Sequence, residues 1–319
     1  MLNFTIENTS EIVKKLFLHL YIYISLNIHI MNHITKDDYM TKNDTIIFAY
    51  YFNKKLDVDL LLKFNKLIFS DFYWLHDGLF EAYENNYIHE LNYYGSHFDQ
   101  EANSLPSSIT HLIFGSRFNQ EVKSLPFSIT HLTFGEYFNQ EVNKLPQNIT
   151  HLTFGDNFNQ EVNNLPQGLT HLTFGDDFNQ EINYLPSSIT HLTFDYKFDK
   201  IVNLSPNIKY LKLNCNNQHM IDNLPNSIEE LELDEYFDLE LNNLPTSIHK
   251  VIFSGCYNGS FNEYNRELNC LPNFVEFLQL PQEYNKKILR FPSSLKTIKC
   301  SKSYKFLSDF SNYNVEYYD

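Results

Sequence analysis

The sequence predicts a repeat solenoid, in which about twelve short strands form one parallel β-sheet and are joined by irregular or 3₁₀-like returns. Three observations support this fold class. Leu-Pro pairs recur at a strict spacing of 20 residues, with prolines at Pro106, Pro126, Pro146, Pro166 and Pro186. A Thr-His-Leu-Thr-Phe phrase, once with Ile for the second Thr, recurs at the same interval. Aromatic residues make up 16% of the 319 residues with a single Trp, so Phe and Tyr must supply much of the core.

The repeat series extends beyond these units in both directions. It continues, less regularly, through Pro206, Pro225, Pro245, Pro272 and Pro292. Degenerate copies precede it at 63–69 and 88–94. We therefore assign the solenoid to residues 52–300. Residues 1–51 and 301–319 are predicted to cap it, because a terminal turn would otherwise expose an apolar flank and an unpaired strand edge.

Each unit is expected to contain one strand followed by a turn. In residues 129–146, Leu132 and Phe134 alternate with Thr133, so the strand turns these two apolar side chains inward. A glycine follows the strand where the chain must turn, and we expect it to need a positive φ. The glycines in this place are Gly115, Gly135, Gly155 and Gly175, and Asp195 takes it in the next unit.

Stacking such units creates columns of identical side chains. Two phenylalanine columns are expected inside, one with Phe118, Phe138, Phe158, Phe178, Phe198 and Phe237, the other with Phe114, Phe134, Phe154, Phe174 and Phe194. An asparagine column follows the first, at Asn119, Asn139, Asn159 and Asn179. We expect these asparagines to bond backbone groups between turns, because buried polar groups need partners.

The frame L-x-x-L-x-L with a later Leu-Pro is that of the leucine-rich repeat. The phrase "LPQGLTHLTFGDDFNQEI" at 165–182 more specifically resembles the FNIP repeat, a leucine-rich-repeat variant of giant viruses and social amoebae. The match is close in five units between Leu105 and Phe194 and weaker outside them. The resemblance implies a horseshoe, a giant virus or an amoeba as source, and a cytoplasmic location, in the host if the protein is viral.

The sequence also departs from the FNIP pattern. Its period is slightly shorter, and glutamates stand where the family often has proline, at Glu121, Glu141, Glu161 and Glu181. Many family members carry an amino-terminal F-box, a helical motif that docks on a ubiquitin ligase. Residues before Phe52 do not show one, although "SEIVKKLFLHLYIYI" at 10–24 is compatible with a helix.

Polar residues between the inward positions should form the concave face. In five units this places a histidine there, at His111, His131, His151, His171 and His191. Such a ladder could sense pH or hold a metal, since imidazole titrates near neutrality and is a common ligand. No carboxylate or Cys joins it to complete a coordination shell, so we predict no metal site and favour an exposed ladder copied by duplication.

The same positions change character after the ladder. They carry alternating bands of charge with some aromatic residues, namely Lys209, Tyr210, Lys212, Glu229, Glu230, Glu232, His249, Lys250, Glu276, Phe277, Lys296 and Lys299. One interpretation is a recognition pattern for a protein partner. The alternative is ordinary solvated strands with compensating charge.

One unit, around 256–272, is about seven residues longer than the period, and such insertions often form loops on the binding face. Cys256 and Cys270 flank it, so a disulfide clamp and free thiols are both open. The spread of the four cysteines favours free thiols in a reducing compartment.

Charge and motif content exclude several functions. The formal charge of −15 would repel nucleic acid and anionic membranes. The apolar stretch at 16–30 is interrupted by His19, Asn27 and His29, which favours a capping segment over a signal peptide or a membrane span. No phosphate loop, HExxH, GxSxG or CxxC motif occurs, so we predict neither a cofactor nor an enzyme.

The sequence thus predicts a non-enzymatic scaffold that binds a protein, in particular a host cytosolic protein, through the concave sheet. Residues 209–299 are expected to contribute most. Two alternatives remain: a substrate receptor that binds ubiquitin-ligase subunits through a diverged motif in residues 1–51, and a metal- or pH-responsive histidine ladder. The sequence leaves the oligomeric state open.

Overall fold

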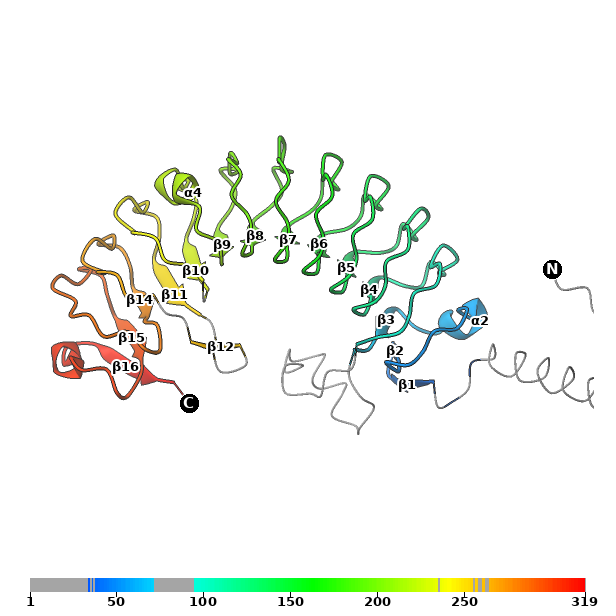
Figure 1. Cartoon of the computed structure of the whole chain (residues 1–319), viewed down its shortest axis with the longest axis horizontal. Coiled ribbons are helices and arrows are strands. Elements are labelled where there is room, and N and C mark those ends of the chain that lie inside the picture. The colour runs from blue at the N-terminus through cyan, green and yellow to red at the C-terminus, as the bar shows by residue number, and fades with distance from the viewer. Residues whose placement is uncertain are drawn as a thin grey trace, which may run out of the picture.

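The computed structural model describes residues 34, 36, 38–71, 95–234, 236–254, 256–257, 260–261 and 264–318. One 14-stranded sheet runs through it in the order β1-β2-β3-β4-β5-β6-β7-β8-β9-β10-β11-β14-β15-β16. The strands line the inner side of an arc, and the returns lie on its outer side (Figure 1). The predicted solenoid with a parallel sheet is therefore confirmed.

The sheet is built from very short strands. They are β1 (Tyr39–Lys42), β2 (Thr45–Phe48), β3 (Lys66–Phe69), β4 (His111–Ile113), β5 (His131–Thr133), β6 (His151–Thr153), β7 (His171–Thr173), β8 (His191–Phe194), β9 (Tyr210–Leu213), β10 (Glu230–Leu233), β11 (Lys250–Phe253), β14 (Phe277–Gln279), β15 (Thr297–Cys300) and β16 (Asn314–Tyr317). Two further strands, β12 (Cys256–Tyr257) and β13 (Ser260–Phe261), form a separate antiparallel pair within the predicted insertion.

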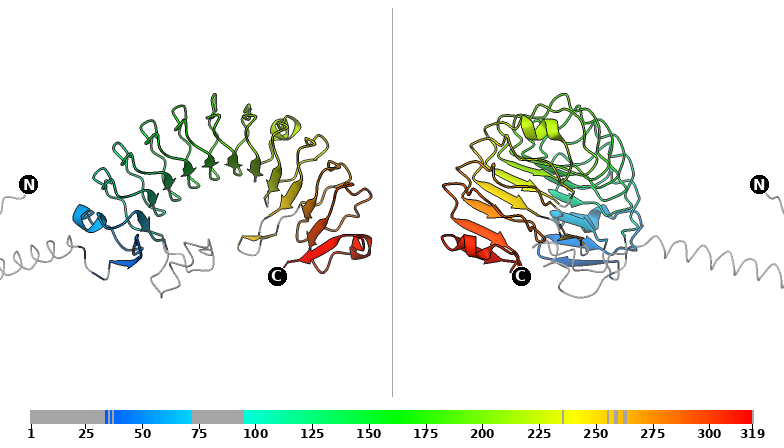
Figure 2. Two further views of the ribbon diagram at one scale, coloured as in Figure 1. Left: turned by 180° about the vertical axis from the view of Figure 1, so that it is seen from behind. Right: turned by 60° about the vertical axis from the view of Figure 1, so that its left-hand side comes forward.

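Within the described residues, helical structure is confined to short pieces of the returns. These are α2 (Val58–Leu61), α4 (Gln218–Asp222) and the 3₁₀ helix η2 (Leu307–Phe310). Figure 2 shows from two further sides that α4 lies on the outer surface of the arc, away from the strands. Within the described residues, no helix has the length and apolar character needed to cross a membrane.

Strand register places equivalent residues of neighbouring units side by side. Within the 14-stranded sheet, all neighbours from β2 onward are parallel, and β1 pairs antiparallel with β2. Leu132 of β5 faces Leu112 and Leu152, and is 1% exposed. His131 and Thr133, on either side of Leu132, are only partly buried. The alternation in the sequence therefore turns the leucines into the core and the polar residues toward the concave side.

The two phenylalanine columns stack as predicted. Phe114 lies 5.7 Å from Phe134, and Phe118 lies 6.1 Å from Phe138, between ring centroids. Within a unit the two columns touch, because the rings of Phe114 and Phe118 are 3.7 Å apart. Asn217 stands between Phe198 and Phe237 in the column that begins at Phe118, and there helix α4 buries Met220 and Ile221 instead.

The asparagine column joins consecutive turns. The Oδ1 atom of Asn119 accepts the backbone N–H of Asn139 at 2.9 Å, and Oδ1 of Asn139 accepts that of Asn159 at 3.0 Å. The side chain of Gln160 also donates to Oδ1 of Asn139, at 3.0 Å. The prediction that these side chains satisfy backbone groups between turns is confirmed.

The explanation offered for the glycine column is wrong. Of the glycines in the described residues, only Gly95 has a positive φ, 74°. A Cβ atom on Gly155 would instead lie 2.3 Å from the carbonyl oxygen of Gly135. The glycines are needed because the backbones of successive turns touch. The column ends at Asp195, where β8 runs on to Phe194 and Asn214 N–H donates to the Phe194 carbonyl at 3.0 Å.

The sheet continues past both ends of the range 52–300. Strands β1 and β2 precede it, and β16 follows it by pairing with β15. Phe310 of η2 is buried and stacks on Tyr304 at 5.1 Å. The repeat copy predicted at 88–94 and the segment 16–30 lie outside the described residues, so capping by residues 1–51 stays a prediction.

Three of the four cysteines are described in full. Cys215, Cys270 and Cys300 are free thiols, and Cys270 is exposed. Burial raises the pKa of Cys215 to about 12 and that of Cys300 to about 11, so both stay protonated at neutral pH. Because Cys270 is a free thiol, it is not paired with Cys256, so the free-thiol alternative is favoured over the disulfide clamp.

Gly155→Ala should destabilise the solenoid, because its new methyl group would overlap the backbone of the preceding turn. Overpacking of this kind costs about 1–3 kcal/mol. Gly168→Ala is the matched control, since a Cβ there would meet only the Gln147 carbonyl oxygen at 4.0 Å. Thermal unfolding followed by circular dichroism should give a lower midpoint for Gly155→Ala alone. Equal midpoints for the two variants would contradict the backbone-contact explanation.

Candidate interaction surface

The structure brings the predicted site residues into three parallel rows on the concave side of the sheet. The first strand position carries His111, His131, His151, His171, His191, Tyr210, Glu230, Lys250 and Phe277, in continuous register. The third position carries Lys212, Glu232 and Lys299. The residue just before the strand supplies Lys209, Glu229, His249, Glu276 and Lys296. Every predicted site residue therefore lies on one continuous surface.

The five histidines form a stacked ladder. Centroids of neighbouring rings are 4.0–4.1 Å apart, and their planes differ by 12–14°. Each Nδ1 atom lies 2.8–2.9 Å from the hydroxyl of the preceding threonine, as in the pair Thr130 and His131. That hydroxyl also donates to the backbone carbonyl one unit earlier at 3.0–3.3 Å, which belongs to Asn65 in the first unit and to a threonine in the other four. The rings are thus fixed in orientation by the backbone beside them.

Stacking makes the ladder hard to protonate. Burial, and then repulsion from neighbouring imidazoles, lowers the pKa of His131 and of His171 to about 4. Burial is also the main cause that lowers the pKa of His111 and His151. The positive charge of Lys66 lowers the pKa of His111 further, because Lys66 on β3 pairs in register with His111. At neutral pH these four imidazoles are uncharged.

The ring geometry opposes chelation of a metal by the ladder. Ligand nitrogens must point at a common ion about 2.0–2.1 Å away. Rings stacked nearly parallel send their lone pairs in parallel directions, so adjacent histidines cannot converge on one ion without turning. In the described part of the chain, no group of three or more His, Cys, Asp or Glu side chains is arranged to hold a metal.

The charge bands compensate one another across neighbouring strands. Lys209 pairs with Glu229 at 2.7 Å, between Nζ and Oε1. Lys250 reaches back to Glu230 at 2.9 Å. At the far end Lys296 pairs with Glu276 at 2.7 Å. The alternating signs therefore form ion pairs within the sheet, which is compatible with both interpretations made from the sequence.

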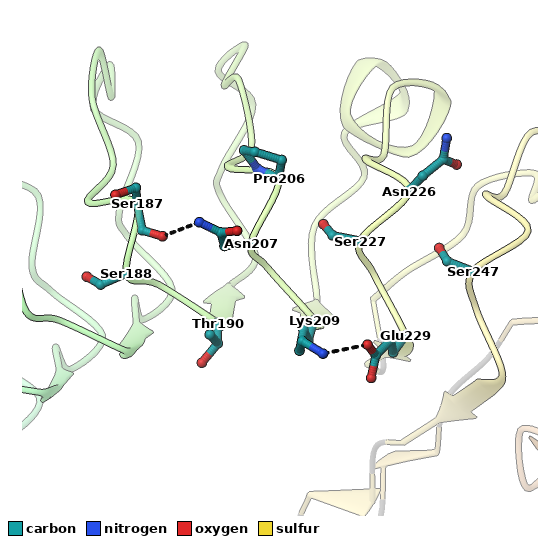
Figure 3. Close-up of a pocket in the computed structure, with 10 residues that line it drawn as sticks. All are labelled: Ser187, Ser188, Thr190, Pro206, Asn207, Lys209, Asn226, Ser227, Glu229 and Ser247. Carbon is teal, nitrogen blue, oxygen red and sulfur yellow. Dashed lines mark hydrogen bonds and ion pairs between the residues drawn. The ribbon is translucent and has the colours of Figure 1, made fainter.

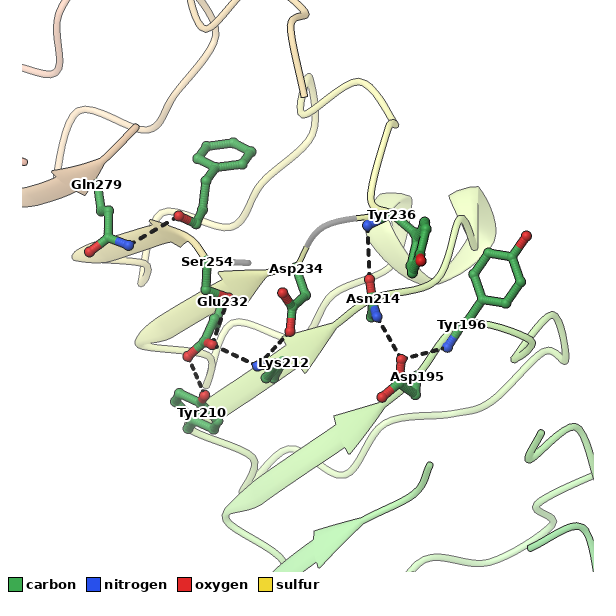
Figure 4. Close-up of polar contacts among 11 residues, drawn as sticks. Asp195, Tyr196, Tyr210, Lys212, Asn214, Glu232, Asp234, Tyr236, Ser254 and Gln279 are labelled. Atoms are coloured by element: carbon green, nitrogen blue, oxygen red, sulfur yellow. Dashed lines mark hydrogen bonds and ion pairs between the residues drawn. The ribbon is translucent and has the colours of Figure 1, made fainter. Parts of the chain in front are cut away.

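A denser network lies on β9 and β10 (Figure 4). Glu232 accepts hydrogen bonds from Tyr210 at 2.5 Å and Ser254 at 2.8 Å, and Lys212 bridges it to Asp234 at 3.0 and 2.6 Å. Burial raises the pKa of Glu232, but the charge of Lys212 and these hydrogen bonds outweigh it and lower the pKa. The network holds a charged, half-buried cluster in one arrangement.

A groove lined mainly by polar residue types, which was not predicted from the sequence, lies beside the concave rows. It has a volume of about 500 Å³ and is lined in part by Ser188, Asn207, Lys209, Ser227 and Glu229 (Figure 3). Ser188 Oγ donates to the Leu169 carbonyl at 2.6 Å, but the equivalent Ser227 Oγ is buried without a partner. The sequence does indicate this place, because the repeat unit there is one residue shorter than its neighbours.

That shortened unit can be located by comparing phenylalanine-to-isoleucine spacings. Phe178 and Ile189 are eleven positions apart, whereas Phe198 and Ile208 are only ten apart. The missing residue lies in the return that forms one wall of the groove. The groove therefore lies at the place where the repeat is one residue short.

The parallel sheet with buried leucine and phenylalanine columns defines a solenoid of the leucine-rich-repeat class, whose members are typically non-enzymatic scaffolds. The FNIP Repeat family model matches residues 98–137, 118–144, 138–164, 161–197, 198–236 and 217–256. The chain therefore belongs to the FNIP-repeat family.

A solved structure supports the leucine-rich-repeat class. The chain is similar to CroV588, described as a novel circular LRR protein, with 32% sequence identity and a TM-score of 0.63. The similarity covers 84% of this chain and 42% of CroV588, so this chain spans less than half the length of that protein. No curated protein matches the chain.

Acidification should weaken the fold through the ladder. Because the pKa of His131 and His171 is about 4 in the folded state and about 6.5 in an unfolded chain, the unfolded state binds more protons between these values. The stabilisation is complete above about pH 6.5 and is lost as the pH falls toward about 4. NMR titration of the imidazole carbons should show both midpoints well below that of free histidine.

A stability measurement needs a control for buried carboxylates, because their effect on the pH dependence of stability is opposite to that of the histidines. Burial raises the pKa of Asp156, Asp176 and Asp195, so these groups favour the folded state as the pH falls. The variant His131→Gln/His171→Gln keeps them and removes the two imidazoles. The melting temperature should fall further for the natural chain than for this variant between about pH 7 and pH 4.5. Equal falls would show that the ladder does not titrate as described.

Proposed function

We propose that the chain is a non-enzymatic scaffold that binds a host cytosolic protein through its concave sheet, chiefly through residues 209–299. The supporting observation is the order of the half-exposed side chains on this sheet. Their contacts are mainly with one another, as in the Tyr210–Glu232–Lys212 cluster, while the core below is filled by apolar residues. A surface already held in one arrangement loses less entropy on binding.

Paired charges change how such a surface would discriminate between partners. Each Lys–Glu pair is nearly neutral at a distance, so long-range steering is weak along these strands. At contact distance the order of signs still matters, because a like charge placed opposite costs binding energy. The concave face is therefore suited to distinguish partners by the order of positive and negative charges along it.

The pH-responsive alternative has support in the stacked rings and lowered pKa values, although the same ring stacking opposes a metal-binding role. The ubiquitin-ligase alternative depends on residues 1–51, and the first 33 of these lie outside the described residues. It stays a prediction. Deletion should stop at residue 33, because β1 and β2 belong to the sheet. Ligase subunits that bind the full chain and not the truncated one would support it.

Reversing charge pairs should abolish partner binding without unfolding the protein. The variant carries Lys209→Glu with Glu229→Lys and Lys250→Glu with Glu230→Lys, which keeps both ion pairs and inverts their order. Exposed pairs contribute only about 0–1 kcal/mol each, so the melting temperature should change little. Affinity purification from amoebal cytosol should recover a partner with the natural chain and lose it with the swapped one.

A control distinguishes this face from the rest of the surface. Lys123 and Glu121 form an exposed ion pair in the return that follows β4, so their swap leaves the concave rows intact. That swap should retain the partner. Recovery of the same proteins with all three chains would argue against recognition by the concave sheet.

A further inference from the structure

Two exposed tyrosines meet on the rim formed by the connections that follow the strands. Tyr196 follows β8 and Tyr236 follows β10, and each is 51% exposed. Their ring centroids are 4.8 Å apart and their planes are inclined by 55°. They come from units two apart, and the unit between them has Cys215 and Asn216 in its connection. The two rings therefore meet across the turn of the intervening unit, which contains Asn214 (Figure 4).

Hydrogen bonds of the underlying turn fix the backbone of both tyrosines. Asp195 Oδ1 accepts the N–H of Tyr196 at 2.9 Å and the side-chain amide of Asn214 at 2.7 Å. Asn214 Oδ1 in turn accepts the N–H of Tyr236 at 2.9 Å. The side chain of Asn216 donates to the Tyr236 carbonyl at 3.0 Å. These bonds hold the backbone of both tyrosines in place, while their side chains stay half exposed.

The pair lies beside carboxylates that act on one another. Asp195 shares a side-chain hydrogen bond with Asp176, and burial and the neighbouring acid raise the pKa of Asp195 to about 6. Burial also raises the pKa of Asp176, with repulsion from Asp156 and Asp177 adding to it. Lys197, which pairs with Asp177 at 2.6 Å, acts in the opposite direction on Asp176 but does not outweigh these causes. A cation placed here would relieve the repulsion.

We propose that Tyr196 and Tyr236, with Asp195 and Asp176 beside them, form a docking surface for a lysine or arginine side chain on a basic segment of a partner protein. An aromatic face attracts a cation within about 6 Å of its centre, and arginine also stacks on aromatic rings. Carboxylates next to the rings supply the complementary charge. The net charge of −15 favours approach of a basic chain. This surface lies outside the concave rows and goes beyond their proposed role.

The test uses a blocked hexapeptide of alternating Gly and Arg, and a matching peptide with uncharged citrulline in place of Arg. Binding to the full chain is measured by titration calorimetry at about 0.15 M salt, where distant charges are screened. The Arg peptide should bind and the citrulline peptide should not. Tyr196→Ala/Tyr236→Ala should weaken binding by about fivefold or more, since each exposed cation–π contact contributes about 0.5–1 kcal/mol.

Matched variants separate the rings from general charge. Tyr196→Phe/Tyr236→Phe should retain the affinity, because a phenyl ring also attracts cations. Tyr184→Ala should retain it as well, since Tyr184 is 85% exposed and lies in a different return. Asp195→Asn should weaken binding. The proposal is overturned if the natural chain does not bind the Arg peptide, or if the double Ala variant binds it equally well at an unchanged melting temperature.

Discussion

Contact between the backbones of successive turns is the constraint on which this structure depends. Strands of one sheet lie about 4.8 Å apart, so every turn must follow its neighbour almost atom for atom. A residue tolerated in one unit is then tolerated in the next only if it stacks on its own copy. Phenylalanine meets this condition by offset stacking, asparagine by linking side chain to backbone, and glycine by leaving room for the preceding carbonyl.

Much of this could be predicted from sequence, because the period itself encodes the contacts. The alternation around Leu132, the stacked phenylalanines and the asparagine links all follow from placing identical units side by side. The glycine column was predicted with the wrong cause. A turn with a positive φ and a turn whose backbone contacts its neighbour both favour glycine, and only the three-dimensional structure distinguishes the two causes.

The features that the sequence left open or did not predict depend on contacts between unlike units. The Lys–Glu pairs join residues whose identities differ from unit to unit, so the sequence shows the bands without showing that they neutralise each other. Tyr196 and Tyr236 touch across an intervening unit, and a comparison of adjacent repeats does not bring them together. The groove near Ser227 arises from one absent residue. Each of these lies where the repeat is least regular, and each bears a candidate recognition surface.

The histidine ladder has one more consequence, because β4 to β8 are nearly identical in sequence and contacts. A unit in this block meets the same neighbours on both sides, so one copy could be gained or lost while every remaining interface kept its form. Such a change would move β3 and the charged strands from β9 onward closer together or farther apart by one strand spacing. The uniform block thus behaves as a spacer of adjustable length, and gene duplication could tune the span between two dissimilar surfaces without redesigning either.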